Sequence, residues 1–265
     1  RRSSCSSGAY NIVQSYDTAL TLRTETPLGN ARFNIAGGSI GRHAVFAGGD
    51  SSNSTAHYDV DAYDDALSHT LPTELSENRT ELAATTIGNY LLFGGGNNGR
   101  TTSYSDVDAY NLSLTRTTPS NLSEARGSLA ATTVGGYALF GGGASYENSH
   151  SVTVDAYNSS LTRTTATQLR GGGERITATT AGEYALFGGG NWKSASAIVD
   201  AYDLSLTRIP VTDLSAQKWG ASAVTLEEYA MFCGGASSSR ELDTIDMYDS
   251  SLTRISPSPA PLSAA

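Results

Sequence analysis

The chain has 265 residues, of which 16% are charged, and it carries a formal net charge of −9. This charge argues against nucleic acid as a partner, because phosphates would be repelled. No run of about 18 apolar residues is present that could cross a membrane. Only two cysteines occur, which excludes a disulfide scaffold and a cysteine-rich zinc site. The 28 glycines and 14 tyrosines favour short strands joined by tight turns.

The chain opens on a polar loop, residues 1–10, followed by a first strand candidate over residues 11–16. The same element returns as Val-Asp-Ala-Tyr four times and once as Ile-Asp-Met-Tyr. After each copy come a turn and a second element, which reads Leu-Thr-Arg in the later copies and has decayed in the first two. These two elements, termed strands c and d, therefore occur six times: c ends at Tyr16, Tyr63, Tyr110, Tyr157, Tyr202 and Tyr248, and d begins at Leu20, Leu67, Leu114, Leu161, Leu206 and Leu252.

Two further elements occur five times each. Strand a is a run of small residues at 82–87, 129–134, 176–181 and 220–225, with its weakest copy at 33–37. Strand b is an apolar run closed by glycines, intact as Tyr-Ala-Leu-Phe-Gly-Gly-Gly at 137–143 and 184–190. Its phenylalanines are Phe46, Phe93, Phe140, Phe187 and Phe232, which lie 47, 47, 47 and 45 residues apart. A fixed period in this range indicates a modular repeat fold.

Each unit is thus predicted to contain four antiparallel strands of about five to eight residues. No segment shows sustained 3.6-residue periodicity, so almost no helix is expected. Four short strands cannot bury both of their faces alone, and radial stacking of such sheets gives a β-propeller. We expect strand a, rich in Ala and Thr, nearest the axis, and strand b sandwiched between neighbouring blades. The prediction is one all-β domain over 1–265, with a half repeat at 1–30 and repeats starting near 31, 78, 125, 172 and 217.

These motifs resemble the kelch repeat, in which a glycine pair closes the second strand and a Tyr-Asp pair ends the third. The Tyr-Asp pair stands at residues 16–17, 63–64, 202–203 and 248–249, with Asn111 and Asn158 replacing the aspartate elsewhere. The tryptophan of the family's fourth strand is replaced by the leucine that begins strand d. The chain is similar to divergent, repeat-rich proteins predicted in Gram-positive gut bacteria and their phages. The glycine pairs are Gly48 and Gly49, Gly95 and Gly96, Gly142 and Gly143, Gly189 and Gly190, and Gly234 and Gly235.

The number of blades is not fixed by the repeats, because five copies of strands a and b accompany six copies of strands c and d. A six-bladed ring that lacks one inner hairpin is the first choice. Five closed blades with a redundant half blade, or a piece of a longer array, are the alternatives. The half blade would then be completed by flanking sequence or by another chain.

The loops between strands b and c differ completely from copy to copy, whereas the strands barely change. A constant scaffold with one variable set of loops suggests a binding surface. In the kelch family these loops share one face with the d–a loops. Trp192 either contacts a ligand or packs within its own loop. The candidate contacts of the b–c loops are His57, Tyr58, Arg100, Tyr104, Tyr146, Glu147, His150, Trp192, Lys193 and Arg240, with Asn191 beside them.

A cation recurs in the d–a loops, fourteen residues before the strand-b phenylalanine. The resemblance implies that this residue rims the axial opening and contacts acidic ligands. A structural role, in which it pairs with a nearby acid, is the favoured alternative. For the repeated strand-c aspartates we expect hydrogen bonds, for instance from the arginine of Leu-Thr-Arg, rather than a ring of calcium ligands. The cations are Arg32, Arg79, Arg126 and Lys218, with Gly173 interrupting the series.

No catalytic constellation emerges from the repeats. The four histidines recur at no equivalent position, and the glycine-rich stretch at 94–99 follows no strand-to-helix pattern that would favour phosphate binding. We therefore predict no metal, no cofactor and no enzymatic activity. Cys5 and Cys233 would lie on the same face of adjacent blades if the ring closes, where a disulfide could form within the usual Cα separation of about 7 Å.

Together these patterns predict a non-catalytic binding module that recognises a glycan or a protein through the b–c and d–a loops. We expect it outside the cell, on a cell or virion surface, with any export signal or anchor outside this chain. The competing prediction is a structural part of a larger assembly. A kelch-type enzyme ranks third.

Overall fold

Short antiparallel strands form all the regular structure of the computed structural model, which describes residues 8–51, 55–147, 150–192, 194–255 and 262. No helix occurs among these residues, as predicted, so none is present that could span a membrane. The strands are two to five residues long. They are thus shorter than expected, because turn residues begin close to each motif.

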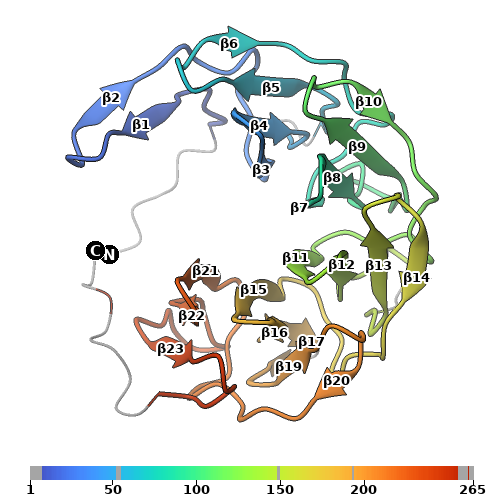
Figure 1. Cartoon of the computed structure of the whole chain (residues 1–265), viewed down its shortest axis with the longest axis vertical. Helices are drawn as coiled ribbons and strands as arrows, with labels where there is room; N and C mark the ends of the chain where they lie inside the picture. Colours follow the sequence, from blue (N-terminus) through green and yellow to red (C-terminus); the bar gives the residue numbers. More distant parts are fainter. Residues whose placement is uncertain (1–7, 52–54, 148–149, 193, 256–261, 263–265) are drawn as a thin grey trace.

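The strands build five blades, which follow one another in chain order around a central axis (Figure 1). The first blade contains β3 (Ala36–Ile40), β4 (His43–Ala47), β5 (Val60–Tyr63) and β6 (His69–Thr70); the second contains β7 (Ala83–Ile87), β8 (Tyr90–Gly94), β9 (Val107–Asn111) and β10 (Arg116–Thr117). The third contains β11 (Ala130–Val134), β12 (Tyr137–Gly141), β13 (Val154–Asn158) and β14 (Arg163–Thr165). The fourth contains β15 (Thr177–Ala181), β16 (Tyr184–Gly188), β19 (Val199–Tyr202) and β20 (Arg208–Ile209); the fifth contains β21 (Ser222–Leu226), β22 (Tyr229–Cys233) and β23 (Ile245–Tyr248). In the fifth blade a bridge between Tyr248 and Arg254 stands where the fourth strand would be.

The five-bladed alternative is therefore the one the structure supports, and the preferred six-bladed ring is not found. The half repeat forms a separate two-stranded sheet, β1 (Gln14–Tyr16) and β2 (Leu22–Thr24), at the end of the row beside the first blade (Figure 1). A blade needs both an inner and an outer hairpin, and the half repeat supplies only the outer one.

Within a blade the strands run from the axis outward in the predicted order a, b, c, d (Figure 1). The weakest strand-a prediction, residues 33–37, is shifted: β3 begins only at Ala36. Strand b is buried on both faces, as the residues of β8, β12 and β16 after the initial tyrosine show. Its phenylalanine pairs in register with the strand-c aspartate, for example Phe140 with Asp155.

Neighbouring blades pack through the strand-b phenylalanine. A Cβ atom added to Gly94 or Gly141 would come within 2.8 or 2.7 Å of Phe140 or Phe187 of the following blade. The ring of Phe140 also meets the buried ring of Tyr157 edge-on, with centroids 5.9 Å apart. Because the glycine has no side chain, the phenylalanine of the following blade can pack directly against its backbone.

A second connection between blades lies near the axis, just before the start of each strand a. The N–H of Ser128 donates to the carbonyl oxygen of Glu81 at 2.9 Å, that of Arg175 to Ser128 at 3.0 Å, and that of Gly220 to Arg175 at 3.0 Å. These residues are spaced by one repeat, so a ladder of backbone hydrogen bonds runs from blade to blade. All four have positive φ.

Candidate functional site

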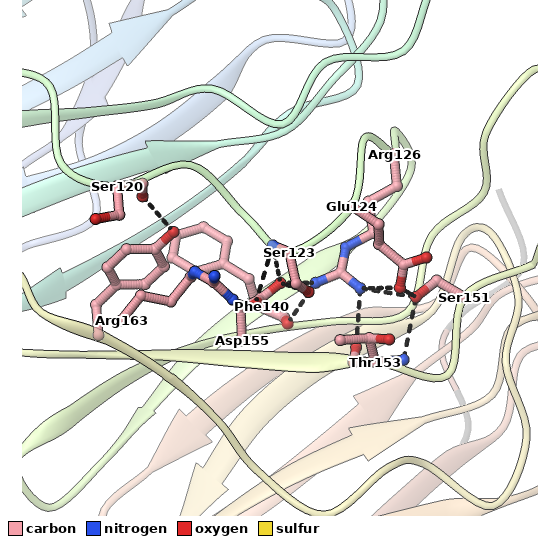
Figure 2. Close-up of polar contacts among 10 residues, drawn as sticks. Ser120, Ser123, Glu124, Arg126, Phe140, Ser151, Thr153, Asp155 and Arg163 are labelled. Atoms are coloured by element: carbon pink, nitrogen blue, oxygen red, sulfur yellow. Dashed lines mark hydrogen bonds and ion pairs between the residues drawn. The ribbon is translucent and has the colours of Figure 1, made fainter.

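A buried cation binds the strand-c aspartate inside the third blade (Figure 2). Nη2 of Arg126 lies 2.8 Å from Oδ2 of Asp155, and both side chains are almost fully buried. The guanidinium also donates to the Ser151 hydroxyl at 2.7 Å and to the Thr153 carbonyl at 3.0 Å. On the other side of the carboxylate, Nη1 of Arg163 lies 3.0 Å from Oδ1.

The same cluster recurs in three other blades. Arg32 pairs with Asp61, Arg79 with Asp108 at 2.5 Å, and Lys218 with Asp246 at 2.9 Å; every one of these side chains is fully buried. Burial alone would raise the pKa of Asp246. Hydrogen bonds from Lys218 and Ser215 outweigh this effect and hold the pKa below its ordinary value.

The fourth blade departs from the pattern at Gly173, as the sequence shows. Arg170, three residues before Gly173, binds the strand-c aspartate instead: its Nε lies 2.8 Å from Oδ1 of Asp200. It also reaches Asp213 at 2.8 Å. Unlike the cations of the other blades, this one remains partly exposed.

The arginines of strand d were predicted to bind the strand-c aspartates, and this prediction is confirmed. Arginine nitrogens lie 3.4, 3.0, 3.8 and 3.2 Å from the carboxylates in the second to fifth blades, and His69 replaces the arginine in the first. Among the described residues, no group of three His, Cys, Asp or Glu side chains could hold a metal ion. Because Arg32, Arg79, Arg126 and Lys218 are buried in these pairs, we assign them the structural role and not contact with a ligand.

The b–c loop of each blade lies beside the d–a loop that leads into the next one. Backbone hydrogen bonds join them: the N–H of Arg79 donates to the carbonyl of His57, that of Arg126 to Tyr104, and that of Lys218 to Ser196. The two loop sets therefore form one continuous surface, which we call the loop face.

Two adjacent pockets open on the loop face around Tyr146. The inner pocket, about 230 Å³, is lined by residues of the second, third and fourth repeats. The outer pocket, about 320 Å³, lies between the b–c loops of the second and third blades. Ser103, Ser145 and Tyr146 belong to both. The inner pocket is completed by Glu81, Asn97, Ser128, Ala144 and Glu174, and the outer one by Thr101, Thr102, Glu124, Ala125 and Glu147.

A third pocket of about 300 Å³ opens further along the same face. Its walls are Gly171 and Gly172, residues 194–198 of the fourth b–c loop, and Asp213 and Gln217. Among the described side chains, none of those that line it is aromatic, in contrast to the pair around Tyr146.

The structure brings only part of the predicted contact set together. Tyr146 and Glu147 line the pocket pair. Arg100 is exposed next to Thr101, in the b–c loop that lines the outer pocket, whereas Tyr58 and Arg240 are exposed on other loops. Tyr104 and His150 are half-buried. His57 is half-buried and held by Asp59, with Nδ1 2.9 Å from a carboxylate oxygen.

Other predicted residues lie partly or wholly outside the described residues. The backbone of Trp192 pairs with Ser194 in the small hairpin of β17 (Asn191–Trp192) and β18 (Ser194–Ala195), but its side chain is not described. Lys193 and Cys5 are outside the described part of the chain. Cys233 is a half-buried thiol, and burial raises its pKa. The disulfide therefore stays a prediction.

Of the four acidic residues that line the pockets, only Glu147 was predicted from the sequence. Glu81 and Glu174 stand at the start of strand a, and Glu124 stands in a d–a loop. A signal was present: the position of Glu81 is Asn34, Ser128 and Arg175 in other copies, which is variation at the edge of a constant strand. The predicted contacts came from the b–c loops and from the recurring cation of the d–a loops, so this second variable position was not among them.

Comparison with known proteins shows the fold alone. No family model matches the chain, and no curated protein matches it. Among solved structures, one described as "Structure of YjhT" aligns with a TM-score of 0.71 and 11% identity, covering 94% of this chain and 97% of its own. In all, 430 solved chains match, so the architecture is widely shared and does not select a function.

Proposed function

We propose that this β-propeller is a non-catalytic, kelch-like binding module that takes a glycan or a protein ligand on its loop face. One observation carries the proposal: the pockets of the loop face gather where the repeats differ, while the strands beneath them are nearly constant. Binding sites commonly sit on variable loops held by a rigid scaffold. Display outside the cell, on a cell or virion surface, suits such a module.

The experiment is a glycan array, with a panel of candidate surface proteins, probed with the labelled chain. A loop-face variant carries Tyr58→Ala, Tyr146→Ala and Trp192→Ala. A control carries Leu112→Ala and Leu204→Ala, which are exposed leucines of c–d turns. We expect the loop-face variant to lose binding and the control to retain it. Binding that survives the loop-face changes, or is lost only in the control, would overturn the proposal.

Assembly is the second candidate, and a specific observation favours it. In the fifth blade Val224 and Leu226 are 51% and 60% exposed, whereas their counterparts in the fourth blade, Thr179 and Ala181, are 6% and 0% exposed. In addition, β1 pairs on one edge only among the described residues, while strands c of the first four blades pair on both. A stable multimer on light scattering, with no ligand bound on the array, would favour this candidate.

A further inference from the structure

We propose that the pocket pair around Tyr146 binds a short saccharide, with one sugar residue on each side of the tyrosine, and that it selects neutral or amino sugars against acidic ones. This inference rests on the proposed function and names its ligand class. The two pockets share Tyr146, Ser103 and Ser145 as a common wall, so a ligand of two linked rings can occupy both.

Tyr146 is held in place yet remains accessible. Its hydroxyl lies 3.4 Å from Oδ1 of Asn97, and its backbone N–H donates to the Ser103 hydroxyl at 3.3 Å. The residue nevertheless stays 47% exposed. A tyrosine fixed at both ends offers a rigid apolar surface with a polar tip, at a small cost in conformational entropy. Such a surface suits the C–H face of a sugar ring.

Hydrogen-bond acceptors surround the inner pocket. Oε2 of Glu81 accepts from Asn97 at 2.9 Å and from the Ser128 hydroxyl at 2.6 Å, which fixes the carboxylate. Its second oxygen and the Glu174 carboxylate have no hydrogen bond to the described residues. An ionised carboxylate can only accept, so it matches ligand groups that donate, such as hydroxyls and ammonium groups.

The charge of the pockets sets the selectivity. Among the described residues, Glu81, Glu174, Glu124 and Glu147 contribute to the lining, and no Arg, Lys or His does; the cation next to it in the chain is Arg100, which precedes Thr101. Burial would raise the pKa of Glu124. Hydrogen bonds from Ser151 and Thr153 and the charge of Arg126 outweigh it, so Glu124 is ionised at neutral pH. Arg126 itself is buried and bound to Asp155, and the four carboxylates outnumber the exposed Arg100, so the field of the pockets is negative. A carboxylate or sulfate on the sugar would be repelled, and an ammonium group would be attracted.

The test is calorimetric titration of the full chain with three disaccharides of similar size. They are the N-acetylglucosamine disaccharide, which is neutral, the glucosamine disaccharide, which is cationic, and an N-acetylglucosamine–glucuronic acid disaccharide, which is anionic. We expect the cationic sugar to bind at least as well as the neutral one, and the anionic sugar to bind at least about tenfold more weakly. Added salt should weaken the preference for the cationic sugar, because exposed charges are screened.

Two variants and one control separate stacking from charge. Tyr146→Ala should remove binding of all three sugars, and Glu174→Gln should reduce the preference for the cationic sugar while leaving the neutral one bound. Tyr16→Ala removes an exposed tyrosine at the end of β1, outside the loop face, and should change neither. Circular dichroism verifies that each variant folds.

The inference is overturned if the anionic sugar binds best, if Tyr146→Ala binds like the wild type, or if none of the three sugars binds. If none binds while another ligand is lost in the loop-face variant, the binding module stands and only its ligand class is wrong. If nothing binds to the loop face at all, both proposals fail.

Discussion

Asp155 shows how one buried side chain fixes the path of several segments. Its carboxylate receives the N–H and hydroxyl of Ser123 from the d–a loop, the guanidinium of Arg126 from the same loop, and that of Arg163 from β14 (Figure 2). Equivalent carboxylates receive the backbone N–H of Gly29, Ser76, Arg170 and Ser215. A charge can stay buried here because every lone pair has a donor.

Replacing Asp155 with alanine should lower the free energy of unfolding by about 3–5 kcal/mol, because Arg126 would be left buried without its counter-charge. Asp65→Ala is the matched control: Asp65 pairs with Arg42, and both side chains are more than half exposed. The control should cost about 1 kcal/mol at most. Urea denaturation followed by circular dichroism measures both, and similar losses would contradict the assigned role.

The glycine pairs act at the same scale. Gly95 has φ +68°, and a Cβ there would lie 2.6 Å from the carbonyl oxygen of Arg126 in the next blade. The N–H of Gly96 donates to that same carbonyl at 2.8 Å. The pair therefore lets one blade touch the backbone of the next.

Gly95→Ala should destabilise the protein by more than about 1 kcal/mol, because both its φ and its surroundings exclude a side chain. Gly136→Ala is the control: a Cβ at Gly136 would meet nothing within 4 Å, and its φ lies outside the left-handed region. This change should be neutral or stabilising by about 0.4–1 kcal/mol. If the two variants melt alike, the close approach is not what the glycine pair provides.

At the scale of the element, the turn between strands c and d explains why asparagine can replace aspartate. In each copy one side-chain oxygen, Oδ1, accepts two backbone N–H groups, as Asp64 does from Ala66 and Ser68 and Asn111 does from Ser113 and Thr115. Only an acceptor is needed, so the charge is dispensable. The leucine that follows, for instance Leu114, has φ +58° and packs against the preceding blade.

Strands differ in protection according to their neighbours. β12 is paired on both edges and buried between blades. β22 is also paired on both edges, but one of its faces is only partly buried. Within the described part of the chain, β1 is paired on one edge only. Hydrogen exchange should therefore be slowest in β12, faster in β22 and fastest in β1, because local opening exposes less apolar surface at the ends of the row. Equal protection of β1 and β12 would mean that β1 is covered in solution.

At the scale of the whole molecule, the blades form a row in which each contacts mainly its neighbours, and a buried tyrosine repeats at every junction. The Tyr63, Tyr110, Tyr157 and Tyr248 hydroxyls donate to a backbone carbonyl of the preceding repeat at 2.8–2.9 Å. Burial raises the pKa of Tyr63 to about 12, with a further contribution from Asp61, and raises the pKa of the other three.

This repetition predicts alkaline unfolding. The unfolded tyrosines titrate near pH 10, and the folded pKa values lie higher, so their contribution to stability is complete below about pH 10 and declines as the pH rises towards 12. Tyrosinate absorbance of the buried set should appear together with loss of the near-ultraviolet circular dichroism signal. Early ionisation in a protein that stays folded would contradict this.

A matched pair of variants sharpens the test. The Tyr157 hydroxyl is bonded to Ser120, whereas the Tyr202 hydroxyl is buried without a hydrogen-bond partner among the described residues. At neutral pH, Tyr157→Phe should cost about 0.5–1.5 kcal/mol and Tyr202→Phe should be nearly neutral. Each variant should lose less stability with rising pH than the wild type.

The sequence alone determined the repeat, its four strands, their order from the axis outward and the strand-d partners of the strand-c aspartates. These features are local and periodic: alternation, turn residues and a recurring glycine pair act within one repeat, and five copies make each signal visible. Even so, β3 was misplaced, because its copy, residues 33–37, has lost the small-residue pattern. The number of blades also stayed open, since no single repeat encodes how many neighbours it will have.

Only the tertiary structure decided which side chains of different repeats come into contact. It buried Arg32, Arg79, Arg126 and Lys218, which a family resemblance placed at the rim. It also gathered Glu81, Glu174 and Tyr146 from three different repeats into one pocket. Such a pocket forms where the b–c loop of one blade meets the d–a loop of the next. Its composition therefore depends on the stacking of variable loops, for which a periodic sequence carries no local signal.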